Sequence, residues 1–226
     1  MNRFKQISKI KHSVQCLLLS TVGILSGCVG SYNPMTIDVE NGQFVARGVI
    51  DETTPKVMSK AIAANPSIDV FVLEGVPGSV DDEANLVAAR VLRNAGINTI
   101  VPQNGVVASG GTDLFLAGKE RKIAPGACVG VHTWAAPSLT GFKAGSDFPK
   151  DDPQHQLYLS YYDEMGIPAD FYWYTLDAAP VDDIHFMAPQ EMNRFNMATQ
   201  PLTYEQKEST KQNYQRCFER LIATEE

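Results

Sequence analysis

Residues 69–79 read Asp69-Val-Phe-Val-Leu-Glu-Gly-Val-Pro-Gly-Ser79, an apolar run followed at once by a turn rich in glycine and proline. Residues 69–73 are predicted to form a short strand that is buried on both faces. The turn leads into a predicted helix over 80–94, with Ser79 and Asp82 in capping-box positions. A buried strand that passes directly into a helix is the building unit of a parallel α/β sheet.

The same alternation continues on both sides of this stretch. In chain order, we predict a hairpin over 36–50 turning at Asn41-Gly42, a helix over 55–64, strands over 98–102 and 106–108, a helix from 109–111 to 117 and a strand over 127–132. This order predicts an α/β fold, with a parallel sheet and flanking helices in a single domain over 36–200.

The second half of the chain is less regular. We expect a loop over 135–152, a helix over 154–165, an aromatic segment over 171–174, a strand over 184–187 and a helix that starts at 189–191. The aromatic segment favours packing or subunit contact over a cofactor site. Thr203-Tyr-Glu-Gln206 has the form of a capping box. It predicts a C-terminal helix that reaches about Ala223, within a helical tail over 201–226.

The first 27 residues have the composition of a secretory signal. They hold no acidic residue, and four basic residues precede an apolar run over 13–27 that is too short to span a membrane. The run ends in Leu25-Ser-Gly-Cys28, which resembles the bacterial lipobox. That resemblance implies cleavage before Cys28, acylation of its thiol and a tether over 28–35. Because Val29 follows the cysteine, we expect anchoring in the outer membrane, facing the periplasm.

Charge excludes one class of function. The chain carries 19 basic and 26 acidic residues, for a net charge of −7. Cleavage would remove only basic residues, leaving 15 basic against 26 acidic, a net −11. Nucleic-acid binding needs basic surfaces that neutralise phosphates, so it is not expected.

The cysteines and histidines bear on disulfides and metals. Cys16 would be lost with the leader, which leaves Cys128 and Cys217 as the free thiols. They could pair in an oxidising compartment, although their separation in the sequence does not say whether they lie close together. The four histidines show no zinc-like spacing, and no metal or organic cofactor is expected.

Three features fall at carboxyl ends of predicted strands. They are the turn at Gly78-Ser79, Ser109 in Ala108-Ser-Gly-Gly111, and His132 at the end of 127–132. In a parallel sheet these ends share one edge, where ligands bind. A nucleophile, a base and backbone N–H groups would then face one crevice. Taken singly, each has a plainer explanation as a helix cap or a core residue.

The order of these motifs resembles the Clp-type serine protease and crotonase-like fold, and most closely the secreted Clp-like proteins of bacteria. The resemblance covers about residues 44–195. It rests on four segments: Val76-Pro-Gly-Ser79, Ala108-Ser-Gly-Gly111, Leu116-Ala-Gly-Lys-Glu-Arg121 and Gly130-Val-His132. Two departures are Ser79, where the family turn has glycine, and the absence of cysteines at Val107 and Gly111.

The resemblance implies a role for each matching residue. Ser109 would be the nucleophile and His132 the general base, and the backbone N–H groups of Ser79 and Gly110 would form the oxyanion hole. The third member of the triad would be Asp183, or its neighbour Asp182, because they precede Phe186-Met-Ala-Pro-Gln-Glu191. A Ser–Lys pair with Lys119 is a less favoured alternative.

Together these features predict a lipid-anchored periplasmic serine hydrolase, specifically a peptidase that forms an acyl-enzyme. Its partners would be a peptide or protein substrate, the membrane through acylated Cys28, and copies of itself in a homo-oligomer. The leader and the Ser–His pair disfavour coenzyme A binding. The alternative is a catalytically inactive Clp-like fold that acts as a binding or assembly lipoprotein.

Overall fold

The computed structural model describes residues 32–138 and 141–224. The predicted leader, the lipobox cysteine Cys28 and most of the tether lie outside these residues. In the part of the chain that is described, no helix is long and apolar enough to cross a membrane.

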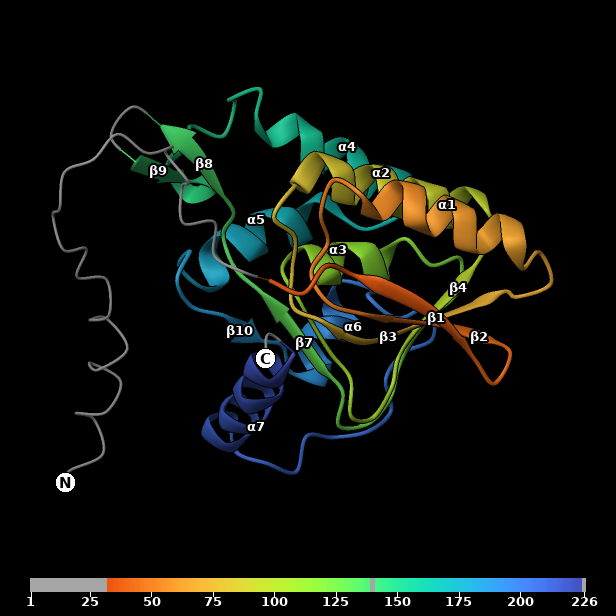
Figure 1. Cartoon of the computed structure of the whole chain (residues 1–226). Helices are drawn as coiled ribbons and strands as arrows, with labels where there is room; N and C mark the ends of the chain where they lie inside the picture. The colour runs from red at the N-terminus through yellow and green to blue at the C-terminus, as the bar shows by residue number, and fades with distance from the viewer. Residues whose placement is uncertain (1–31, 139–140, 225–226) are drawn as a thin grey trace, which may run out of the picture. The chain divides into compact units, whose positions relative to one another are not determined.

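The central sheet is mixed but mostly parallel, as predicted (Figure 1). Its main path runs β1 (Thr36–Glu40), β2 (Gln43–Arg47), β3 (Val70–Val76), β5 (Val106–Ala108), β7 (Cys128–Val131) and β10 (His185–Phe186). A branch adds β4 (Asn98–Val101) beside β3, and β6 (Arg121–Ile123) beside β4. Only β1 and β10 pair antiparallel to their neighbours in this sheet.

Strand β3 is the centre of the sheet, because it pairs with three others. Its first half lies beside β4, with Val70 opposite Asn98, and its end lies beside β5, with Gly75 opposite Val106. Strand β2 covers its other edge. Buried side chains follow from this position, and Phe71 is fully enclosed. The predicted strand is confirmed, but the prediction that both of its faces are buried is wrong: Phe71 and Leu73 are buried on one face, whereas Val70 and Val72 on the other are only partly buried.

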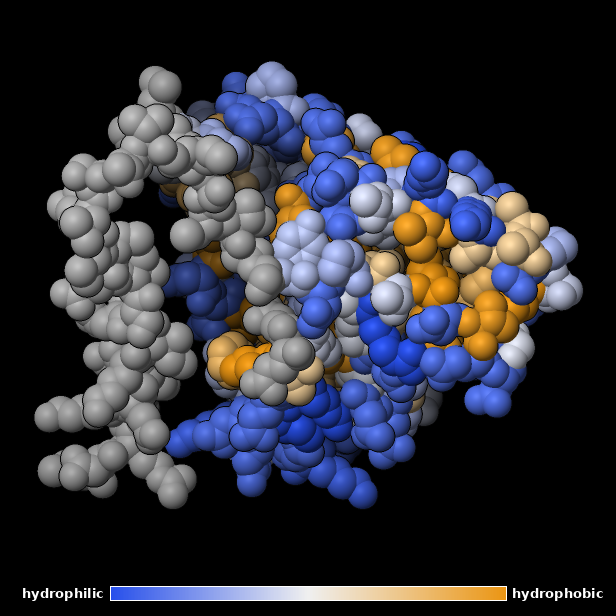
Figure 2. Space-filling view, viewed as in Figure 1, coloured by the Kyte–Doolittle hydropathy of each residue, from blue (hydrophilic) through white to orange (hydrophobic). Residues whose placement is uncertain are grey.

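Seven helices are described. They are α1 (Thr54–Ala64), α2 (Asp82–Asn94), α3 (Gly110–Leu116), α4 (His155–Met165), α5 (Ala169–Ala178), α6 (Pro189–Arg194) and α7 (Thr210–Ala223). Figure 1 shows α1, α2 and α4 above the sheet, with α7 below β7. The face seen in Figure 2 is mostly hydrophilic, with apolar residues scattered over α1 and the β1–β2 hairpin. Such scattered apolar residues are normal for a protein surface.

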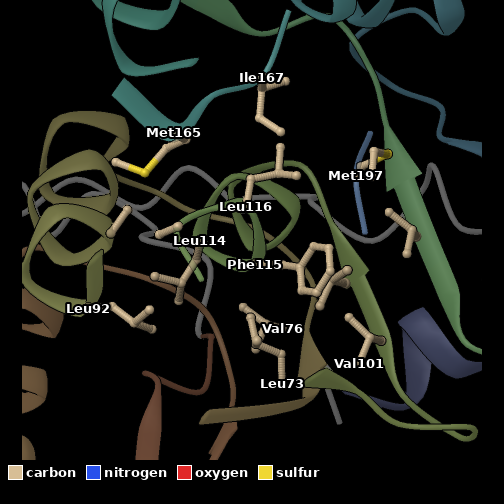
Figure 3. Close-up of a cluster of buried hydrophobic side chains, with 14 of the residues drawn as sticks. Leu73, Val76, Leu92, Val101, Leu114, Phe115, Leu116, Met165, Ile167 and Met197 are labelled. Atoms are coloured by element: carbon tan, nitrogen blue, oxygen red, sulfur yellow. The ribbon is translucent and has the colours of Figure 1, made fainter. Parts of the chain in front are cut away.

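Helix α3 runs through the core. Leu114, Phe115 and Leu116 are completely buried. Figure 3 shows them surrounded by side chains from β3 and α2, by Met165 at the end of α4 and by Ile167 just after it. A helix this short is stabilised by packing and not by its own helix propensity. The core therefore fixes the residue just before α3, which is Ser109.

The predicted loop over 135–152 is more ordered than its composition indicated. It contains an antiparallel pair, β8 (Ala135–Ser138) and β9 (Gly141–Ala144), followed by a short 3₁₀ turn over Gly145–Asp147. Strand β6 was also not predicted. They were missed because their sequences, Arg-Lys-Ile in β6, Ala-Ala-Pro-Ser in β8 and Gly-Phe-Lys-Ala in β9, contain no run of apolar strand-forming residues.

The C-terminal helix starts later than predicted. Ser209 accepts a hydrogen bond from Gln212 N and forms the capping box, so α7 begins at Thr210 and not at Thr203. Two capping-box sequences follow each other here, and only packing selects between them. Helix α7 lies against β5 and β10. The predicted helical tail over 201–226 therefore contains a helix that packs against the sheet of the domain.

A disulfide bond joins Cys128 at the start of β7 to Cys217 in α7. The Cα atoms lie 5.5 Å apart, within the normal range for a disulfide, and the two residues are 89 positions apart in the chain. The sequence left open whether Cys128 and Cys217 pair, and in the structure they do. The bond fastens α7 to β7, the strand that His132 directly follows.

Replacing both cysteines with alanine is expected to destabilise the domain. A loop of this length is constrained in the unfolded chain by the bond, which contributes about 2–4 kcal/mol to stability. Thermal unfolding should shift downward by roughly 5–15 °C. Reductant should produce a similar shift in the natural chain and none in the double variant. A natural chain that is insensitive to reductant would contradict the role of the bond.

Candidate functional site

Ser109 occupies the turn between β5 and α3 with φ 51° and ψ −128°, a conformation that L-residues rarely adopt. Such strain persists only where the surroundings enforce it. Here Ser109 N donates to Gly130 O at 3.1 Å, and Thr112 Oγ1 donates to the same oxygen at 2.8 Å. Both sides of the turn are therefore tied to β7.

The turn at Gly78-Ser79 lies against Ser109, as predicted. A Cβ on Gly78 would come 3.3 Å from the Ser109 Cβ. Ile50 N donates to Gly78 O and Val80 N donates to Ile50 O, each at 2.9 Å. In this parallel bridge the N–H of Ser79 points away from Ile50. Across the described residues it donates to no acceptor.

Gly110 brings a second backbone donor to the same place. It is the first residue of α3, so its N–H has no acceptor within the helix. A Cβ on Gly110 would lie 2.4 Å from Ser79 Oγ, which shows how closely the two segments approach. The predicted oxyanion donors, Ser79 and Gly110, are thus neighbours beside Ser109.

His132 follows β7 and faces the same space. It lines a cavity of about 40 Å³ together with Ser109 and Gly110. Within the described residues, the Ser109 hydroxyl makes no hydrogen bond to His132 or to any other group. Ser109 and His132 therefore share a cavity without a hydrogen bond between them.

The environment of His132 favours its neutral form. Burial lowers the pKa of the imidazole below its usual 6.5, although the Asp82 carboxylate acts in the opposite direction. Its Nδ1 atom is buried, and no partner for it is found among the described residues. A neutral imidazole can accept a proton, which is the chemistry that a general base needs.

Asp183 and Asp182 lie elsewhere. Asp183 Oδ1 accepts hydrogen bonds from Tyr214 Oη at 2.7 Å and from Ile184 N at 2.8 Å, and Asp183 lines a different cavity beside α7. Asp182 is exposed, and so is Lys119. None of the three lines the cavity of Ser109 and His132. The hydrogen bond from Tyr214 joins Asp183 to α7.

Two other carboxylates line the cavity, and the sequence reasoning gave neither a chemical role. Asp82 lies in the first turn of α2, where its Oδ1 accepts from Ser79 Oγ and its Oδ2 from Tyr158 Oη, both at 2.6 Å. Asp113 lies one turn into α3 and accepts from Tyr162 Oη at 2.6 Å. Both residues follow turn motifs that were singled out in the sequence. They were given no chemical role because an acidic residue in the first turn of a helix normally stabilises the helix dipole.

Burial raises the pKa of Asp113 to about 7. The hydrogen bond from Tyr162 lowers this pKa, while the nearby charge of Asp82 raises it. Within the described chain, no salt bridge pairs either carboxylate with a cation. The cavity therefore combines a neutral base with acidic groups that lack a counter-charge.

Aromatic side chains cover the cavity. Trp134 stacks on Tyr158 with ring centroids 5.8 Å apart, and Tyr158 stacks on Tyr172 at 5.7 Å. Trp134 Nε1 donates to Tyr172 Oη at 2.9 Å, and His155 Nδ1 lies 2.6 Å from the same oxygen. A space of about 40 Å³ holds roughly two or three waters.

The titration of Asp113 predicts a pH-dependent effect on stability. A carboxyl whose pKa is raised on folding opposes folding when ionised, so the penalty is absent below pH 3.8 and complete above about pH 7. Asp113→Asn keeps an acceptor for Tyr162 and removes this charge. Since Asp113 keeps some exposed surface, we expect a gain of about 1–2 kcal/mol at pH 8 and none at pH 4.

Thermal unfolding at the two pH values measures this difference. Asp163→Asn, at an exposed position on α4, serves as the matched control and should change little at either pH. Equal effects of Asp113→Asn at pH 4 and pH 8 would contradict the assigned titration.

Comparison with known proteins gives distant likenesses only. No family model and no curated protein matches the chain. Among solved structures, a membrane-bound stomatin-specific protease bound to a substrate peptide, in mutant form, is 17% identical. The match spans 66% of this chain and 71% of the protease chain, with a TM-score of 0.45. A second mutant of that protease is 16% identical, covering 66% and 75%, with a TM-score of 0.46. An enoyl-CoA hydratase from Polaromonas sp. JS666 is 13% identical, covering 84% and 78%, also with a TM-score of 0.46. At these values the likenesses carry no argument about this chain's function.

Proposed function

We propose that the protein is a serine hydrolase that cleaves acyl compounds through a covalent intermediate on Ser109. One observation carries the proposal: Ser109 is held at positive φ beside the backbone N–H groups of Ser79 and Gly110, and it shares its cavity with His132, whose pKa is lowered by burial. A strained serine at a strand-to-helix turn presents its hydroxyl to a substrate. The strained backbone of Ser109 does not itself stabilise the fold, and it persists because the surrounding packing holds it.

The reaction follows from these positions. Ser109 Oγ attacks the carbonyl carbon and passes its proton to His132. The carbonyl oxygen becomes negatively charged and accepts hydrogen bonds from the N–H groups of Ser79 and Gly110. His132 returns the proton to the leaving group, whose bond to carbon breaks. Water then attacks the acyl-enzyme, giving a proton to His132, and the acid is released as Ser109 recovers its proton.

We further propose that the enzyme is a peptidase, anchored by acylated Cys28 and facing the periplasm. The anchor rests on the lipobox-like sequence, and the site of action rests on the leader. The disulfide between Cys128 and Cys217 is consistent with an oxidising compartment. The peptide substrate rests on the sequence resemblance to Clp-type proteases.

A second candidate is the inactive scaffold. The observations that favour it are the small covered cavity and the absence, within the described residues, of a hydrogen bond between Ser109 and His132. In that case the site would bind no acyl group, and Ser109 would serve only the turn.

Labelling with a fluorophosphonate separates the two functions. The probe should modify Ser109 in the folded full-length chain, and Ser109→Ala should abolish the modification. Ser59→Ala is the matched control, because Ser59 is an exposed serine whose hydroxyl donates only to Pro55 O. Peptide mass spectrometry locates the adduct. An unlabelled Ser109 in folded protein would exclude the hydrolase and favour the scaffold.

The rate of labelling should depend on the protonation of His132. Because burial lowers the pKa of this base below 6.5, the base stays mostly neutral at pH 6.5. The labelling rate at pH 6.5 should therefore be more than half of the rate at pH 8. It should drop below half only at a lower pH. A midpoint at or above pH 6.5 would show that His132 is not the base in this environment.

A further inference from the structure

Asp82 occupies a position that neither the sequence resemblance nor the proposed mechanism uses. It lies in the first turn of α2, directly after the turn that carries the oxyanion donor Ser79. It lines the cavity of Ser109 and His132, whereas Asp183 lines another. The carboxylate that lines the site thus comes before Ser109 in the chain, whereas the expected one, Asp183, comes after it.

The contacts of Asp82 join three parts of the site. One carboxylate oxygen accepts from the hydroxyl of Ser79, and the other accepts from Tyr158 on α4, each at 2.6 Å. Its negative charge acts on the imidazole of His132, in the direction that favours protonation. The helix N-terminus is a favourable place for that charge, because the helix dipole is positive at this end.

Other groups also face His132. Asp113 of α3, Tyr158 and Tyr162 of α4, and Tyr172 of α5 share its cavity. On the β10 side, His185 pairs with Val131 of β7 and binds Glu191 at 3.0 Å, so its charge is already matched. Asp82 is the carboxylate that both attracts the imidazole and contacts the oxyanion turn.

Resting on the proposed hydrolase, we propose that Asp82 takes the place of Asp183 as the acidic positioning residue of the site. It holds the Ser79 turn in register with Gly110 through the Ser79 hydroxyl. It also supplies the negative charge that stabilises His132 when the imidazole carries the proton of Ser109. This role would also explain why serine stands at position 79, where the family turn has glycine, because glycine has no hydroxyl to donate to Asp82.

The test compares Asp82→Asn with two matched variants. Asp183→Asn removes the rival carboxylate. Asp81→Asn removes a charge from the adjoining residue, whose side chain caps α2 through Ala84 N and does not line the cavity. The pKa of His132 is read from imidazole NMR signals of the full-length chain, assigned with His132→Gln. This measurement needs no catalytic activity.

Asp82→Asn should lower the pKa of His132 further and slow fluorophosphonate labelling of Ser109 by about tenfold to a hundredfold. Asp81→Asn and Asp183→Asn should leave both measurements close to those of the natural chain. A fall in the pKa with Asp183→Asn and not with Asp82→Asn would overturn the proposal. So would equal effects of Asp82→Asn and Asp81→Asn.

Ser79→Ala isolates the contact with the turn. This variant keeps the backbone N–H and the charge of Asp82 but removes the hydroxyl that joins them. Labelling should slow while His132 titrates as in the natural chain. An unchanged labelling rate would remove the positioning role. If the natural chain is not labelled at all, the proposed hydrolase fails, whereas the NMR titration still decides whether Asp82 acts on His132.

Discussion

The closest approach in the site is between the start of α3 and the end of β3, and the rest of the arrangement depends on it. A Cβ on Gly111 would lie 2.1 Å from Val76 O, so only glycine allows the helix to begin there. This contact sets how closely α3 approaches β3. Ser109 occupies the turn directly before it, with a strained φ of 51°. The cost of that strain is offset by the burial of Leu114, Phe115 and Leu116 behind it.

Burial has opposite effects on the acid and the base of the cavity. It lowers the pKa of His132 and raises that of Asp113, because in both cases the charged form loses its water. The enclosed groups are thus held close to neutrality. The carboxylate of Asp82, in contrast, accepts hydrogen bonds from two hydroxyl groups, one of them on the turn that carries Ser79.

The sequence predicted the parallel sheet, the turn motifs and the proximity of Ser79, Ser109, Gly110 and His132. These depend on local patterns and on the rule that strand ends meet at one edge. The acidic residue could not be placed in the same way. Asp183 precedes a recognisable motif, but its side chain accepts a hydrogen bond from Tyr214 of α7, which is 31 residues away in the chain. The start of α7 was ambiguous for a similar reason, since tertiary packing decides between two equivalent caps.

The disulfide has a consequence for the elements that cover the cavity. The β8–β9 pair, α4 and α5 all lie between Cys128 and Cys217, within the closed loop. A protease that cuts the chain once in this interval, for example in the exposed segment around Lys150, would yield two pieces still joined by a covalent bond. They would migrate as one molecule until reduced. In an environment where chains are nicked, the covering helices would stay attached to the strand that bears His132, and the domain could outlast damage to its own cover.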